Sequence, residues 1–149
     1  MDNVERIIEL AEQQCSEHGA RLTRKRKVIL QGLLSANKAL SAYELVDVCK
    51  SQTGDELPPM SIYRILNFLV AENLVHKLEL ANKYIACAHI SCSHSHGDPQ
   101  FLICRQCNKV REVDIKQRTL DDLKLSALNA GFKVVGSQIE LNCICDDCA

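Results

Sequence analysis

The sequence predicts an α+β protein of two domains: a helical N-terminal domain that ends in a β-hairpin, followed by a small α/β domain. Apolar residues recur with helical spacing as far as about residue 73. Two short segments then flank a turn at Ala81 and Asn82, which is typical of a hairpin. The remainder is rich in cysteine and alternates strand-like and helical patterns. We place the domains at residues 1–84 and 85–149, within a chain long enough for two small cores.

Four helices are predicted in the first domain. The first covers about residues 4–15 and ends near Gly19, and the second begins after Thr23 and reaches about residue 34. Ser41 and Glu44 form an S-x-x-E capping box that opens the third helix. After Pro58 and Pro59 break the chain, we expect Ser61 to cap a fourth helix over residues 62–73.

Helices followed by a hairpin form the winged helix-turn-helix pattern, in which the last helix enters the DNA major groove. Ile62, Ile65, Leu66 and Leu69 form one apolar stripe of the fourth helix, so Tyr63, Arg64 and Asn67 are predicted to point outward. Arginine bridges a guanine edge and an aromatic ring packs on a thymine methyl. Five cations within residues 21–27 (Arg21, Arg24, Lys25, Arg26 and Lys27) would meet phosphates.

The second domain is predicted to hold strands at 101–103 and 110–113, a helix over 116–130 closed by Gly131, and a strand over 133–141. This unit is too small to be stable alone, so we expect it to pair with a second copy.

Cysteine usage points to metal binding. Of nine cysteines, all but Cys15 and Cys49 lie after residue 86, and those two fall on helical patterns as buried thiols. The odd count and the absence of an export signal favour a reducing compartment, where clustered cysteines are metal ligands. No apolar run is long enough for a membrane span, so the protein is expected to be cytoplasmic.

Two C-x-x-C units, Cys104 with Cys107 and Cys145 with Cys148, can converge on one closed tetrahedral zinc site. Cys143 is an alternative to Cys145, although C-x-C is the less common knuckle. A redox dithiol is disfavoured because it needs a C-x-x-C at a helix N-terminus after a strand. A second group of nitrogen and sulfur side chains surrounds the domain boundary with the composition of a metal site: His76, Cys87, His89, Cys92, His94 and His96, with Glu112 after the first knuckle.

Together these residues resemble the ferric uptake regulator family, and within it the zinc uptake regulator branch. The resemblance spans nearly the whole chain. It is carried by RLTRKR at 21–26, SAYE at 41–44, PPMSIYRIL at 58–66, VHK at 75–77, FLICRQC at 101–107, Glu112 and the terminal C-x-x-C. Relatives usually have proline where Arg24 stands.

The resemblance implies a homodimeric, zinc-responsive repressor of zinc-uptake genes that binds an AT-rich palindromic operator in double-stranded DNA and holds two Zn²⁺ per chain. It implies a structural site of Cys104, Cys107, Cys145 and Cys148 and a sensing site of His76, Cys87, His96 and Glu112. His94 or Cys92 is an alternative to His96, because the loop looks lengthened. It implies DNA contacts from Tyr63, Arg64, Tyr43, Arg24 and Lys25.

Other functions fit less well. A sensing site with one thiolate suits zinc, whereas iron- and peroxide-sensing relatives resemble sites of nitrogen and oxygen only. A zinc deaminase needs an H-x-E motif that no histidine here provides. A thiol oxidoreductase is a remote alternative, and we expect no enzyme.

Overall fold

A computed structural model describes residues 2–36, 38–54, 56–88, 90, 100–136 and 138–149. It divides into two compact units, and the boundary along the chain falls between the described residues Ile90 and Gln100. His89, Cys92, His94 and His96 of the predicted metal-binding region lie outside the described residues. Within the described ranges, no helix combines the length and apolar character needed to cross a bilayer.

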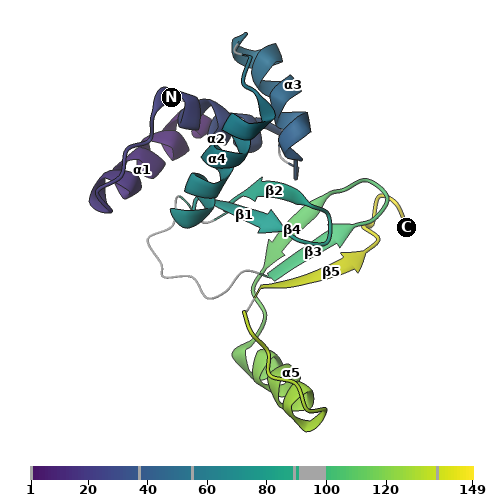
Figure 1. Cartoon of the computed structure of the whole chain (residues 1–149). Helices are drawn as coiled ribbons and strands as arrows, with labels where there is room; N and C mark the ends of the chain where they lie inside the picture. The colour runs from purple at the N-terminus through teal and green to yellow at the C-terminus, as the bar shows by residue number, and fades with distance from the viewer. Residues whose placement is uncertain (1, 37, 55, 89, 91–99, 137) are drawn as a thin grey trace. The chain divides into compact units, whose positions relative to one another are not determined.

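Where the first unit is described, it contains four helices and a hairpin (Figure 1): α1 (Asn3–Glu17), α2 (Arg24–Ala36), α3 (Ala42–Thr53), α4 (Pro59–Ala71), β1 (Val75–Leu78) and β2 (Lys83–Ala86). The strands pair antiparallel, with His76 opposite Ile85. Leu40 forms a further bridge with Tyr84 and so ties the segment before α3 to the hairpin. The positive φ of Asn82, 51°, allows the tight connection between the strands.

One apolar core joins the helices and the hairpin. Helix α4 contributes the buried stripe that the sequence predicts, Ile62, Ile65, Leu66 and Leu69. Leu30 and Leu33 of α2 and Leu45 of α3 pack in the same cluster. Cys15 and Cys49 are buried within it, which confirms their prediction as core thiols.

Two helix starts test the capping predictions. The Ser41–Glu44 capping box is confirmed: Glu44 N–H donates to Ser41 Oγ at 3.1 Å, and Ser41 N–H donates to Glu44 Oε1 at 3.2 Å. The prediction that Ser61 caps the fourth helix is wrong. Helix α4 begins at Pro59, with Pro58 as its N-cap. Proline is compatible with the first helical turn because an N–H there has no helical partner.

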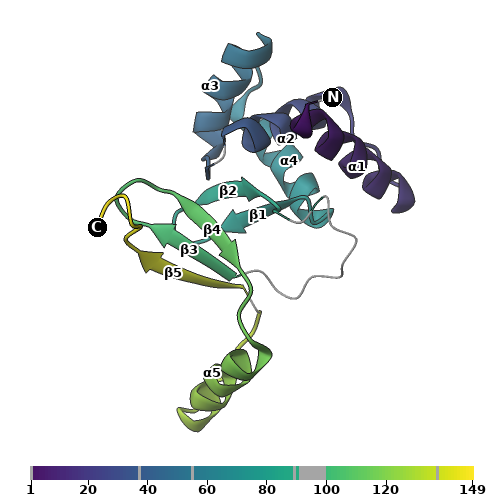
Figure 2. The ribbon, with the colours of Figure 1, turned by 180° about the vertical axis from the view of Figure 1, so that it is seen from behind.

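The described residues of the second unit form a three-stranded sheet and one helix, best seen in Figure 2: β3 (Gln100–Cys104), β4 (Val110–Val113), α5 (Gln117–Asn129) and β5 (Ile139–Cys143). The strand order is β4-β3-β5, with β3 antiparallel to β4 and parallel to β5. The expected strand over 133–141 is only partly correct, because residues 133–136 form no strand and β5 starts at Ile139.

The apolar residues of α5 and its following segment are not covered within one chain. None of the residues of α5 is buried. Large apolar side chains are exposed there: Leu123, Leu125, Leu128, Phe132 and Val135.

Candidate metal centres and nucleic-acid surface

The first pair of site cysteines leaves the end of β3. Cys104 is the last residue of that strand and is 2% exposed. Its N–H donates to the Lys109 carbonyl at 2.8 Å, and its carbonyl accepts from Asn108 N–H at 3.0 Å. Asn108 has a φ of 62°, a value that asparagine tolerates better than most residues. This tight turn returns the chain toward β4 and presents Cys107 at the surface.

The second pair follows β5. Cys148 N–H donates to the Cys145 carbonyl at 3.0 Å, so the last residues close a turn of their own. Cys104 lies opposite Cys143 in the parallel pairing, and Arg105 N–H donates to the Cys143 carbonyl at 2.9 Å. Because neighbouring parallel strands end at the same edge of a sheet, the two C-x-x-C turns emerge side by side.

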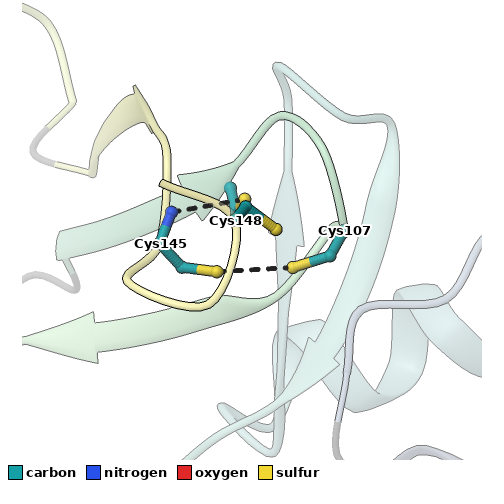
Figure 3. A group of neighbouring side chains, drawn as sticks. Cys107, Cys145 and Cys148 are labelled. Atoms are coloured by element: carbon teal, nitrogen blue, oxygen red, sulfur yellow. Dashed lines mark hydrogen bonds between the residues drawn. The ribbon is translucent and has the colours of Figure 1, made fainter.

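The four sulfurs form one cluster. The Sγ atoms of Cys104, Cys107, Cys145 and Cys148 all lie within 4.8 Å of one another. Figure 3 shows Cys107, Cys145 and Cys148 directed toward a common centre, with 3.7 Å between the Sγ atoms of Cys107 and Cys145. A tetrahedron with Zn–S bonds of about 2.3 Å has edges of roughly 3.8 Å, so this donor set fits a zinc ion. Cys143 is outside the cluster, and its Sγ lies 3.5 Å from the Leu141 carbonyl.

The electrostatics of the cluster favour a cation. Backbone N–H groups of Cys107 and Cys145 donate to the Cys104 sulfur and lower the pKa of that thiol to about 6. A hydrogen bond with Cys145, together with burial, raises the pKa of Cys148 to about 12. Sulfurs this close resist ionising together, because each negative charge disfavours the next. A divalent cation at their centre would remove that penalty.

The structure also pairs two of the four predicted sensing residues. His76 lies on β1, and Cys87 directly follows β2. Cys87 N–H donates to the Leu74 carbonyl at 2.9 Å and so extends the hairpin ladder by one residue. The nearest ligand atoms of His76 and Cys87 lie within 4.8 Å of each other. Glu112 belongs to the second unit, on β4 opposite Phe101, and His96 is not described.

Helix α4 presents a polar face opposite its buried stripe. Arg64 and Asn67 are exposed. Tyr63 is half-buried and packs against the core cluster, so its ring is less outward than its helical position predicts. Tyr43, in the first turn of α3, is 66% exposed.

Two cations of the basic run at the start of α2, Arg26 and Lys27, contact other parts of the first unit. Arg26 Nη1 donates to the Arg21 carbonyl at 2.6 Å, and its guanidinium lies 3.6 Å from the centroid of the Phe68 ring. Lys27 Nζ forms an ion pair with Glu12 at 2.9 Å. Arg24 and Lys25 are exposed. The sequence pattern predicts the same phosphate-contacting role for all of these cations, because the partners Glu12 and Phe68 are distant along the chain.

Comparison with known proteins places these features in a family. The model of the ferric uptake regulator family matches residues 17–142. The chain is 31% identical over 142 residues to the zinc uptake regulation protein of Escherichia coli (strain K12), an alignment that covers 95% of this chain and 81% of that protein.

Two solved structures are similar over almost the whole chain. A zinc uptake regulator complexed with zinc and DNA has a TM-score of 0.84 at 27% identity, and the match covers 99% of this chain and 96% of that chain. The crystal structure of holo XcZur has a TM-score of 0.73 at 34% identity, and the match covers 95% of each chain. These matches confirm the predicted fold class, a winged-helix N-terminal part followed by a small α/β part.

Proposed function

The chain belongs to the ferric uptake regulator family, and we propose that it is a zinc-responsive, sequence-specific DNA-binding repressor of zinc-uptake genes. The observation that carries the proposal is the pairing of the Cys87 thiol with the His76 imidazole at the end of the hairpin. Sulfur together with nitrogen suits zinc, whereas sites of nitrogen and oxygen only are more usual for iron and manganese. The identity with a zinc uptake regulation protein supports the same choice of metal.

We propose two zinc ions per chain. The structural ion would be held by Cys104, Cys107, Cys145 and Cys148, and its binding would add to the folding stability of the second unit. The sensing ion would be held by His76 and Cys87, with Glu112 and His96 completing the set. The choice of Glu112 and His96 rests on the sequence resemblance alone, and Cys92 or His94 is the alternative to His96.

Bound zinc supplies a cross-link between the side chains that ligate it. His76 belongs to the hairpin, and its backbone is fixed by pairing with Ile85. Because the proposed ligands come from both domains of the sequence, their engagement favours one arrangement of the chain over others. The DNA affinity of the protein then depends on zinc through the difference in zinc affinity between those arrangements.

The proposed DNA contacts divide by chemistry. Arg64, exposed on α4, is the base-reading cation, and Tyr63 lies beside it on the same helix. Arg24, Lys25 and Tyr43 are exposed at the starts of α2 and α3 and would contact the phosphate backbone. An AT-rich palindrome is the proposed operator.

A palindrome calls for a symmetric protein, and we propose a homodimer. Leu123, Leu125 and Leu128 of α5 and Phe132 after it are each more than half exposed. Several large apolar side chains exposed on one helix are typical of a protein interface. A second copy, joined through the second unit, is the proposed cover.

DNA binding at buffered free metal tests the proposal. Purified full-length protein is titrated onto a labelled AT-rich palindromic duplex across free Zn²⁺, Fe²⁺ and Mn²⁺. We expect zinc to tighten binding at the lowest free concentration. Tighter binding with iron or manganese than with zinc would contradict the assignment of the metal.

Two matched variants test the sensing residues. Cys87→Ser should fold, dimerise and keep one zinc per chain, yet lose zinc-activated binding, because a thiolate is replaced by a poor neutral ligand. Cys143→Ser is the control, since that thiol lies outside the four-sulfur cluster. If Cys87→Ser retained wild-type activation, the proposed sensing set would be wrong.

A further inference from the structure

Large exposed apolar side chains are few in the first unit. Among its described residues, only Tyr43, Met60 and Leu80 are large, hydrophobic and exposed, at 66%, 66% and 57% respectively. A single exposed methionine is unremarkable by itself. Met60 is distinguished by its place in the first turn of α4, the helix that carries Arg64.

Helical spacing puts Met60 on the outward face of that helix. Tyr63, Arg64 and Asn67 follow it at i+3, i+4 and i+7, so all four residues lie within one sector of the helix surface. The buried residues Ile62, Ile65, Leu66 and Leu69 occupy the opposite sector. Met60 therefore lies one turn before Arg64, toward the helix N-terminus.

The backbone that carries Met60 is well fixed. Pro58 is the N-cap and Pro59 the first helical residue, and both have restricted φ. The N–H groups of Ser61 and Ile62 both donate to the Pro58 carbonyl, at 3.0 and 3.2 Å. The position of the Met60 Cα is thus set by the same helix that sets Arg64, while its unbranched side chain can adapt to a surface.

The chemistry of the side chain indicates what it would contact. A recognition helix contacts base edges mainly with its N-terminal residues. A thioether carries no positive charge that would attract a phosphate, and it is only a weak hydrogen-bond acceptor. The apolar group that a major-groove edge offers is the 5-methyl of thymine. We propose that Met60 is a specificity-determining residue that packs on the methyl group of a thymine next to the base read by Arg64.

This inference rests on the proposed DNA-binding function, and its test separates the two. Zinc-loaded full-length protein first selects an operator from a library of random duplexes. Each thymine of the selected half-site is then replaced in turn by deoxyuridine, which removes only the methyl group. Affinity is measured for the wild type, Met60→Ala, Met60→Leu and, as a matched exposed apolar control, Leu80→Ala. Arg64→Ala is measured as well, against operators changed at single base pairs, to locate the base that Arg64 reads.

The wild type should lose affinity about four-fold for each contacted methyl, the equivalent of one buried carbon. Met60→Ala should bind the thymine operator more weakly than the wild type does. At the thymine that Met60 contacts, replacement by deoxyuridine should cause no further loss of affinity for this variant. Met60→Leu should restore part of the dependence. Leu80→Ala should keep the wild-type deoxyuridine profile, because that residue lies in the turn between β1 and β2.

Several outcomes would overturn the inference. Arg64→Ala should lose its preference at one base position of the selected half-site. The inference would be wrong if no thymine lay next to that position. Another such outcome is a deoxyuridine profile that Met60→Ala leaves unchanged. In both cases the operator binding of the wild type would still support the proposed function. A wild type that selects no operator with zinc would refute the proposed function, and this inference with it.

Discussion

Replacing Arg26 with methionine should distinguish the cations that stabilise the first unit from those that we propose to contact DNA. The guanidinium of Arg26 is engaged twice within the fold, by the Phe68 ring at 3.6 Å and by the Arg21 carbonyl at 2.6 Å. These contacts fasten the segment before α2 to helix α4. Methionine keeps the length of the side chain and much of its apolar contact, but it removes the charge and the donors.

The cost follows from the two contacts. A partly exposed cation–π contact contributes about 0.5–1 kcal/mol. A hydrogen bond from a charged donor contributes about 1.5–3 kcal/mol, and partial exposure reduces it. Arg26→Met should therefore lower the free energy of unfolding by roughly 1–3 kcal/mol. For a unit of this size, each kcal/mol corresponds to about 4–8 °C in Tm.

The assay combines thermal unfolding with the salt dependence of operator binding, and Lys25→Met is the matched comparison. A phosphate contact contributes about 0.9 to the slope of log K against log salt, so a dimer that lacks Lys25 should lose about 1.8. Arg26→Met should lower Tm and leave that slope unchanged. An Arg26→Met protein with the wild-type Tm and a slope reduced as in Lys25→Met would refute this division of the cations.

Three further predictions concern the second unit and the hairpin. Cys148→Ser should lose one tightly bound zinc per chain and destabilise the second unit, and wild-type zinc content with an unchanged melt would contradict the four-sulfur site. Leu128→Glu should shift the dimer to monomer in sedimentation, since it puts a charge on the exposed apolar face of α5. Lys83→Met should reduce stability by less than about 1 kcal/mol at neutral pH. Lys83 Nζ lies 2.9 Å from Glu44 Oε1, and this interaction lowers the pKa of the Glu44 carboxyl from 4.5. The stability difference should shrink as the pH falls below 4.5 and through that lowered pKa, and a difference that does not change with pH in urea unfolding would refute it.

Local patterns in the sequence predicted much of this fold. The Ser41–Glu44 box was recognisable because both of its hydrogen bonds span only three residues. The hairpin and the stripe of α4 follow from periodicity, and the paired C-x-x-C units from their spacing.

The predictions that were wrong or incomplete concern features that depend on residues distant in the sequence, or on a residue type in a position where it is unusual but allowed. Strand β5 begins at Ile139, the residue that pairs with Gln100 of β3. Val134 and Val135 have the residue types of a strand, but they are exposed in a single chain. The start of α4 was misplaced because proline, read as a break, is acceptable in a first turn. The roles of Arg26 and Lys27 depend on Phe68 and Glu12, which no pattern in the basic run indicates.

The parallel pairing of β3 with β5 has a consequence for the unfolded chain. Zinc in the proposed structural site would tie Cys104 to Cys145, 41 residues apart, and would thereby enclose α5 in a closed loop. A tie that persisted in the unfolded chain would lower the entropy of that ensemble by the equivalent of roughly 4 kcal/mol, by the loop-entropy relation used for disulfides. An ion released on unfolding would instead add its binding free energy to the stability of the folded unit. Unlike a disulfide, this link through zinc would form between reduced cysteines in a reducing environment, and a chelator would remove it reversibly. Because none of its residues is buried within one chain, α5 would then depend on this closed loop, rather than on its own packing, to stay near the sheet.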